Sequence, residues 1–232
     1  MPTILTKNLK VTYLSKKKVE TEALHGISDT FRASLRHVVL GKSGSGKSSY
    51  LMALGGFIAF DGNIYYDGKD IEKTNWKKNN ISYVSQSFDL YPMMTVFDNL
   101  AFPLKQKRMK EEEIAKRVME MGNFLEIPYC LSRLPKELSV GQQQKVALGR
   151  ALIKEPSLLL LDEPFANLDE PFVLRTLDRL KEASKKGPTM IYAANSAKEA
   201  LYFGQYFHIL EEGRLIYSGD SSGVYEYYKD VL

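Results

Sequence analysis

The sequence predicts an α/β fold in which helices flank a parallel core sheet, joined by an antiparallel β subdomain and an inserted helical subdomain. Two observations predict this class. Strand-like and helix-like segments alternate on both sides of a helix-rich middle third, an order typical of parallel sheets. In addition, "SLLLLDEP" at 157–164 is a continuous apolar run closed by acids, as in a strand buried on both faces. We expect one domain over the 232 residues, with 1–86 and 157–232 as its core and about 87–156 as the helical subdomain.

The first 86 residues are expected to be mostly strand. Loose alternation of β-branched and aromatic residues predicts strands, and Asp-Gly pairs predict turns between antiparallel strands. The expected strands are "ILTKNLKVTYL" (4–14), "EALHGISDTF" (22–31), "HVVLG" (37–41), "GNIYYDGKDI" (62–71) and "ISYVSQ" (81–86). Between them, "KSSYLMALGG" at 47–56 is expected to be a helix that ends at its glycine pair.

The remaining elements follow from periodicity and from helix-end signals. Apolar residues of "KEEEIAKRVMEMGNFLEI" (110–127) recur at helical spacing, and Ser139 is a good N-cap for a helix in "SVGQQQKVALGRALIKE" (139–155). A third helix is expected in "PFVLRTLDRLKEASKKG" (171–187). "TMIYAAN" (189–195) reads as a strand that runs into a helix, and "YFHILEEGRLIYSGD" (206–220) as a hairpin that turns at Glu-Gly.

Composition narrows the class of protein. The net charge is +4, and no basic strip with interleaved aromatics is present, so binding to nucleic acid is not expected. The single cysteine, Cys130, rules out an intramolecular disulfide. The three histidines, His25, His37 and His208, are scattered along the chain and do not predict a metal site. No signal peptide and no membrane-spanning segment are expected, so a role at a membrane requires a partner.

A glycine-rich segment after an apolar strand predicts a phosphate-binding loop. "GKSGSGKSS" matches G-x-x-x-x-G-K-[ST] and is followed by a helix, as this motif requires. Glycines let backbone N–H groups surround an anion, a lysine adds a point charge, and the hydroxyl after it can bind Mg²⁺. The expected nucleotide-binding residues are Gly41, Lys42, Ser43, Gly44, Ser45, Gly46, Lys47, Ser48 and Ser49, with Ser48 also a metal ligand.

Two carboxylates close the buried strand at 157–164. Ligands of open α/β sheets bind at the carboxyl edge of the strands. Asp162 is therefore expected to hold the Mg²⁺ shell, and Glu163 to orient or deprotonate an attacking water. Both motifs together predict a site for a phosphate-bearing ligand and Mg²⁺.

Further motifs give the chain a family resemblance. After the phosphate loop come "YVSQ" (83–86), "LSVGQQQ" (138–144), "LLLLDEP" (158–164) and "NLD" (167–169), in that order. The chain resembles the P-loop NTPase subunit that binds ATP in ABC transporters, over essentially its whole length. The middle segment is most similar to importers of sugars and related solutes, although the C-terminal regulatory domain usual in those subunits is not expected here. The motif "LSVGQ", the signature of this family, departs mildly from the usual pattern, because Val140 stands where glycine is frequent.

The resemblance implies a role for each matching residue. Tyr13 is similar to the aromatic residue that stacks on adenine. Gln86 resembles a glutamine that touches Mg²⁺ and the attacking water, beside the contact with the membrane subunit. Ser139, Gly141 and Gln142 resemble signature residues that grip the γ-phosphate of ATP held by an opposite subunit. Asp169 resembles a residue that communicates across the dimer.

Asn195 stands where the family usually has a histidine that reaches the γ-phosphate. An amide can donate a hydrogen bond, but it is shorter than an imidazole and cannot become cationic. Either Asn195 substitutes adequately, or ATP binds and the dimer closes while hydrolysis is slow.

The resemblance also implies partners and a location. A second ABC ATPase subunit would complete the ATP sandwich, as a homodimer or a heterodimer, and transmembrane permease subunits would contact the surface near Gln86. The chain would then lie at the cytoplasmic face of the cell membrane, held there by the permease. Two alternatives remain open: a soluble ABC ATPase that does not serve transport, and a regulatory partner that mainly binds nucleotide.

Overall fold

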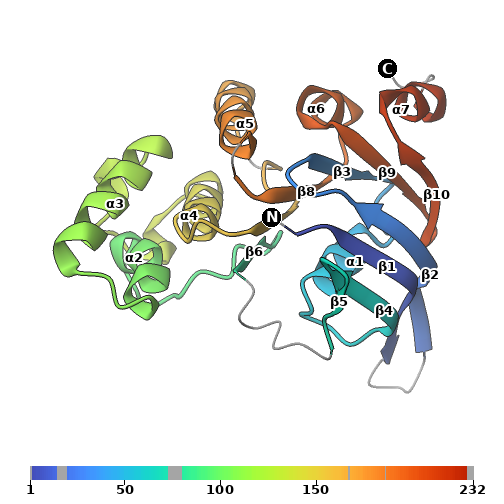
Figure 1. The fold of residues 1–232 in the computed structure, drawn as a ribbon. Helices are drawn as coiled ribbons and strands as arrows, with labels where there is room; N and C mark the ends of the chain where they lie inside the picture. Colours follow the sequence, from blue (N-terminus) through green and yellow to red (C-terminus); the bar gives the residue numbers. More distant parts are fainter. Residues whose placement is uncertain (1, 15–19, 73–79, 167, 186, 229–232) are drawn as a thin grey trace. The chain divides into compact units, whose positions relative to one another are not determined.

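The computed structural model describes residues 2–14, 20–72, 80–166, 168–185 and 187–228. They divide into two compact units (Figure 1). The core unit consists of Met1–Tyr83, Ser157–Glu163 and Arg175–Leu232, and the helical unit of Val84–Pro156 and Pro164–Leu174.

The core unit contains two sheets. The larger is six-stranded in the order β10-β9-β3-β8-β7-β6, and the smaller is four-stranded in the order β2-β1-β4-β5. The strands of the larger sheet are β3 (Arg36–Leu40), β6 (Ile81–Val84), β7 (Leu158–Asp162), β8 (Thr189–Ala194), β9 (Tyr206–Glu211) and β10 (Arg214–Gly219). Those of the smaller are β1 (Ile4–Leu14), β2 (Glu20–Phe31), β4 (Asp61–Tyr66) and β5 (Lys69–Asp70). The predicted fold class is confirmed.

The larger sheet is parallel at its centre and antiparallel at one edge. β3 pairs in parallel with β8 and β9, and β7 pairs in parallel with β8, whereas β9 and β10 form the predicted hairpin. Every residue of β7 and β8 is buried, which explains their uninterrupted apolar sequences. Since parallel strands end at the same edge, the residues that follow β3, β7 and β8 come together there.

Helix α1 (Lys47–Leu54) shares one apolar core with both sheets. Its fully buried side chains include Tyr50, Leu51 and Leu54. Helices α6 (Ala197–Phe203) and α7 (Ser221–Tyr227) pack on the opposite side of the larger sheet from α1 (Figure 1). The sequence analysis did not predict α7.

The helical unit has an apolar core of its own. It contains α2 (Val96–Gln106), α3 (Glu111–Phe124) and α4 (Val140–Leu152), together with the first residues of α5 (Glu170–Ser184). Leu100, Val118 and Val146, one from each of the first three helices, are completely buried in this core. Within the described ranges, no helix has the length and apolar character needed to cross a membrane.

Candidate functional site

The phosphate loop connects β3 to α1, as its sequence predicts. Gly44 and Gly46 have positive φ angles of 81° and 98°, which glycine adopts without strain. A Cβ on Gly46 would approach the carbonyl oxygen of Ala23 to 2.7 Å. Glycine is therefore required at position 46 both by the backbone conformation and by the close approach of β2.

Lys47 lies inside this loop. Its ammonium nitrogen donates to the carbonyl oxygens of Gly41 at 2.8 Å and Lys42 at 3.1 Å, and it lies 3.9 Å from Oε1 of Glu163. Burial lowers the pKa of Lys47, while the negative charges of Glu163 and Asp162 act in the opposite direction. The arrangement places a partly desolvated cation at the carboxyl edge of the sheet, where it can meet an anionic ligand.

Asp162, the last residue of β7, has one oxygen paired and one oxygen unpaired. Oδ2 accepts a hydrogen bond of 2.8 Å from the Tyr83 hydroxyl, whereas Oδ1 is buried without a partner among the described atoms. A buried carboxylate oxygen without a partner is unfavourable unless a cation or a bound water satisfies it. With the partly buried Ser48 hydroxyl at the start of α1, Asp162 offers the oxygen ligands that Mg²⁺ prefers.

Glu163 has an unusual backbone conformation. Its φ is 49°, in the left-handed region, and its N–H donates to the carbonyl oxygen of Ala193 at 3.1 Å. The chain thus turns sharply directly after Asp162, so the two adjacent carboxylates occupy different positions. Glu163 is partly exposed, and its carboxylate faces the ammonium of Lys47.

Tyr13 and Asn195 also belong to the core unit. Tyr13 is 40% exposed, and its hydroxyl lies 3.1 Å from Oγ of Ser49 on α1, so the ring stands beside the phosphate-loop helix. Asn195 is exposed directly after β8, at the edge where the phosphate loop begins. Ser196 follows it and caps α6 through the N–H of Glu199 at 3.3 Å.

The other candidate residues belong to the helical unit. Gln86 is exposed in the turn after β6, and Asp169 accepts a 3.0 Å hydrogen bond from the N–H of Phe172 at the start of α5. Ser139 is the N-cap of α4, as predicted, and forms a reciprocal capping box with Gln142. Gly141 lies in the first turn of the same helix.

Tyr83 was missed by the sequence analysis as a functional residue. It lies on β6, and its hydroxyl orients the carboxylate of Asp162 from the neighbouring edge strand. Tyr83 could have been recognised from its place in "YVSQ", because side chains near the end of β6 reach toward the end of β7.

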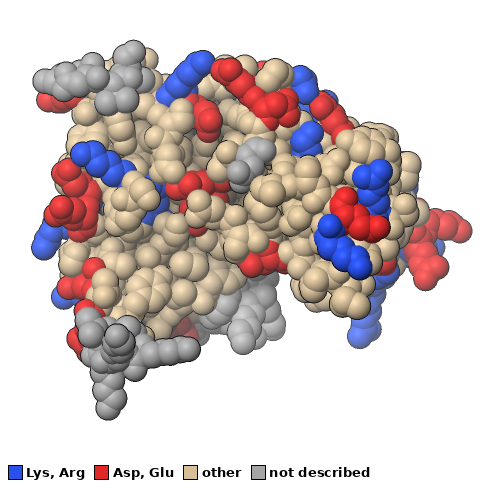
Figure 2. All heavy atoms as spheres, turned by 180° about the vertical axis from the view of Figure 1, so that it is seen from behind, with Lys and Arg blue, Asp and Glu red and all other residues tan. Residues whose placement is uncertain are grey.

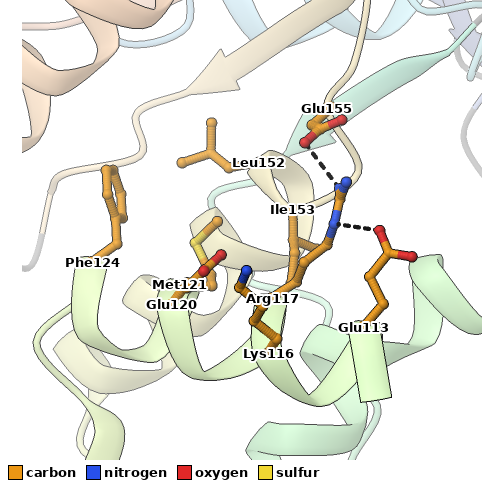
Figure 3. Close-up of a pocket in the computed structure, with 9 residues that line it drawn as sticks. All are labelled: Glu113, Lys116, Arg117, Glu120, Met121, Phe124, Leu152, Ile153 and Glu155. Atoms are coloured by element: carbon orange, nitrogen blue, oxygen red, sulfur yellow. Dashed lines mark hydrogen bonds and ion pairs between the residues drawn. The ribbon is translucent and has the colours of Figure 1, made fainter. Parts of the chain in front are cut away.

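A pocket of about 520 Å³ lies in the helical unit between α3 and the C-terminal end of α4 (Figure 3). Its apolar wall contains Met121, Phe124 and Leu152. At its rim, Arg117 forms ion pairs with Glu113 at 3.4 Å and Glu155 at 2.9 Å. The pocket therefore combines an apolar wall with a charged border, which suits an amphipathic segment of another protein.

The fold and these residues define the class of protein. A P-loop nucleotide-binding protein has a buried parallel strand, a glycine-bearing loop around a lysine, and a helix after that loop. It also has a second strand that ends in carboxylates, and all of these parts are present here. The family model described as ABC transporter matches residues 24–166. The chain belongs to the ABC transporter family, in agreement with the resemblance noted above.

Curated relatives share most of this chain. It is 42% identical over 219 residues to the molybdate/tungstate import ATP-binding protein WtpC of Pyrococcus horikoshii, which covers 94% of this chain and 63% of the relative. It is 36% identical over 235 residues to the glucose import ATP-binding protein GlcV of Saccharolobus solfataricus, covering 97% of this chain and 65% of the relative. The chain thus spans less than two thirds of the length of these relatives.

Solved structures agree with the fold. Two dimeric structures of the ATP-binding cassette MJ0796, one of them a post-hydrolysis state bound to ADP and Pi, each give a TM-score of 0.87 at 28% sequence identity. Each match covers 94% of this chain and 98% of the cassette.

Proposed function

We propose that this chain is one ATP-binding domain that binds and hydrolyses ATP as the motor subunit of an ABC transporter. The observation that carries the proposal is the buried ammonium of Lys47 held by the phosphate loop, 3.9 Å from Glu163 and beside the half-unpaired carboxylate of Asp162. Mg²⁺ bound by Ser48, Asp162 and Gln86 would neutralise developing charge on the phosphates. Turnover of Glu163→Gln and nucleotide binding by Lys47→Ala test the proposal directly.

Each candidate residue has a proposed role. Tyr13 stacks on adenine, since its ring stands exposed beside α1. The loop residues 41–49 bind the phosphates through their N–H groups and through Lys47. Glu163 accepts a proton from the attacking water, and Gln86 and Asn195 orient that water and the γ-phosphate.

A second subunit is part of the proposed mechanism. Ser139, Gly141 and Gln142 present the N-terminus of α4, where helix N–H groups favour an anion. We assign them to the γ-phosphate of ATP bound by a partner subunit, with Asp169 communicating across the interface. Both MJ0796 structures are described as dimeric, which supports a dimeric arrangement.

Substitution of Asn195 by histidine should raise ATP turnover about ten-fold, because an imidazole reaches further and can carry positive charge. ATP affinity should change little, so the rise is expected in kcat at saturating ATP. Asn195→Ala serves as the comparison and should lower turnover further. If Asn195→His gives no increase over wild type, Asn195 does not limit hydrolysis.

Membrane permease subunits are the proposed partners of the helical unit. Two relatives are described as import ATP-binding proteins, for molybdate/tungstate and for glucose, so import of a solute is the proposed direction. The pocket in Figure 3 is the proposed contact for a permease segment, in the same unit as Gln86. Attachment to a permease would place the chain at the cytoplasmic face of the membrane.

Cross-linking should identify this contact. Cys130, the single cysteine, is buried, so Glu120→Cys at the pocket rim supplies one accessible thiol. With a thiol-reactive photo-cross-linker in native membranes, we expect an adduct with an integral membrane protein. Lys69→Cys, on exposed β5 of the core unit, is the matched control and should give none. Adducts with soluble proteins alone would contradict the assignment.

The face shown in Figure 2 does not favour the alternative of a nucleic-acid partner. On the face shown in Figure 2, basic and acidic side chains are intermingled and do not gather into a basic strip. The second candidate function is that of a regulatory partner that binds nucleotide but hydrolyses little ATP. Only Asn195 favours it. Single-turnover ATPase measurements distinguish such a partner from a motor subunit.

A further inference from the structure

A buried chain of polar side chains crosses the core unit. The ring nitrogens His37 Nδ1 and His208 Nε2 lie 2.9 Å apart, and His208 Nδ1 lies 2.5 Å from Oδ2 of Asp29. The Tyr50 hydroxyl donates to the same Asp29 oxygen at 3.2 Å, and the Ser218 hydroxyl donates to the other at 2.9 Å. His37, His208 and Tyr50 are completely buried. These five residues, from β3, β9, β2, α1 and β10, are called the His–Asp network below.

The carbonyl oxygen beside His37 fixes which of its ring nitrogens carries the proton. His37 Nε2 lies 2.9 Å from the carbonyl oxygen of Arg32, which can only accept, so this nitrogen carries a proton. Burial first, and then the neighbouring His208, lower the pKa of His37 to about 4, so its ring is neutral near pH 7. His37 Nδ1 is then an acceptor, and His208 Nε2 donates to it.

Tyr50 completes the network as a donor. Burial first, and then the charge of Asp29, raise the pKa of Tyr50 well above its usual value, so its hydroxyl keeps its proton. The ring of Phe31 stacks on His208 with centroids 4.3 Å apart and also contacts Tyr50. The hydrogen bonds of the network join four strands to helix α1 in a buried environment, where such bonds are stronger than in water.

The network joins the two ends of the phosphate loop. His37 lies on β3, the strand that enters the loop, and Tyr50 lies in the first turn of α1, the helix that leaves it. His208 and Asp29 connect these two residues through hydrogen bonds, and the N–H of Tyr50 donates to the carbonyl oxygen of Gly46 at 2.9 Å. The segment between them is the one whose N–H groups must converge on a phosphate.

We propose that the His–Asp network positions the phosphate loop and thereby sets nucleotide affinity. The inference rests on the proposed function, since it requires that the loop binds phosphate. A loop already held in its binding conformation loses less entropy when the ligand binds. Asp29, His37, Tyr50 and His208 act through the loop and do not touch the nucleotide, so they are positioning residues. Weakening the network should change binding more than the chemical step.

Tyr50→Phe tests this inference because it removes one hydroxyl and keeps the buried ring. Mg-ADP, which is not hydrolysed, serves as the probe in titration calorimetry on the full chain. We expect its Kd to rise about five-fold, the size of one buried hydrogen bond, while kcat at saturating ATP stays within about two-fold of wild type.

Tyr66→Phe is the matched control. Tyr66 is also buried, and its hydroxyl donates to the carbonyl oxygen of Leu54 at the opposite end of α1. Tyr66→Phe also removes one buried hydroxyl, here from strand β4 where it contacts the same helix, so a comparable loss of thermal stability is expected, with the Kd for Mg-ADP unchanged. Equal Kd values for wild type and Tyr50→Phe would overturn the inference, as would an equal rise in both variants. If wild type itself does not bind Mg-ADP, the proposed function fails and the inference fails with it.

A second pair of variants separates hydrogen bonding from packing. His37→Gln can accept from His208 and donate to Arg32, so it should retain wild-type affinity for Mg-ADP. His37→Leu fills a similar volume without either bond and should weaken affinity about ten-fold. If both variants fold and bind equally well, the network does not position the loop. If Tyr50→Phe does not fold, this pair of variants still tests whether the network positions the phosphate loop.

Discussion

Glu163→Gln is expected to lower ATP turnover at least about 100-fold while nucleotide binding persists. A loss of this size is typical when a general base is removed. Glutamine keeps the size and the hydrogen-bonding shape of glutamate but cannot accept a proton at neutral pH. The carboxylate lies 3.9 Å from the Lys47 ammonium. It follows Asp162, whose Oδ2 accepts a hydrogen bond from Tyr83 and whose Oδ1 is buried without a partner among the described atoms. Turnover of the purified chain at saturating Mg-ATP measures the effect.

The same substitution should stabilise a closed dimer. With hydrolysis blocked, ATP remains bound between the phosphate loop of one subunit and the Ser139 helix terminus of the other, so sedimentation with Mg-ATP should show a dimer. Glu72→Gln, an exposed glutamate of the core unit, is the control and should behave like wild type. If Glu163→Gln stays monomeric while wild type dimerises, or if its turnover is unchanged, the role given to Glu163 is wrong.

Features set by neighbouring residues were predictable from the sequence. The phosphate loop needs a strand, glycines, a lysine and a helix in consecutive order, and all of them lie between residues 36 and 54. The N-cap of α4 depends on Ser139 and the residue three positions later, so the capping box could be foreseen. Such signals require no knowledge of how distant segments pair.

Contacts between distant segments were not predictable in this way. His37 and His208, which look scattered in the sequence, come within 2.9 Å because β3 and β9 pair in parallel with Val39 opposite His208. Their separation along the chain gave no sign of this hydrogen bond. The hydrogen bond from Tyr83 to Asp162 similarly depends on which strand borders β7.

Helix α7 could not be predicted from the sequence for a different reason. Its sequence, "SSGVYEY", contains serine, glycine and residues that disfavour helix, so its intrinsic propensity is low. Asp220 caps it through the N–H of Ser222 at 2.9 Å, and packing on β9 and β10 buries Gly223 and Val224. Tertiary packing forms this helix where its own propensity does not.

Lys47→Ala is expected to weaken binding of Mg-ADP about 100-fold, close to the effect of losing strong charge-assisted hydrogen bonds to phosphate. The ammonium is almost fully buried and is held at 2.8 Å and 3.1 Å from loop carbonyl oxygens, so it is already positioned for an anion. Its removal also takes away the cation that Glu163 faces, and this adds repulsion toward phosphate.

Two comparisons separate this electrostatic effect from damage to the fold. Lys47→Met keeps the length and apolar stem of lysine without its charge, and it should lose affinity as strongly as Lys47→Ala while melting closer to wild type. Lys69→Ala removes an equal charge from the exposed surface of β5 in the same unit and should bind Mg-ADP normally. Calorimetry on the three variants decides the outcome. If Lys47→Met retains affinity within about two-fold of wild type, the buried ammonium does not bind the phosphates, and the loop requires a different role.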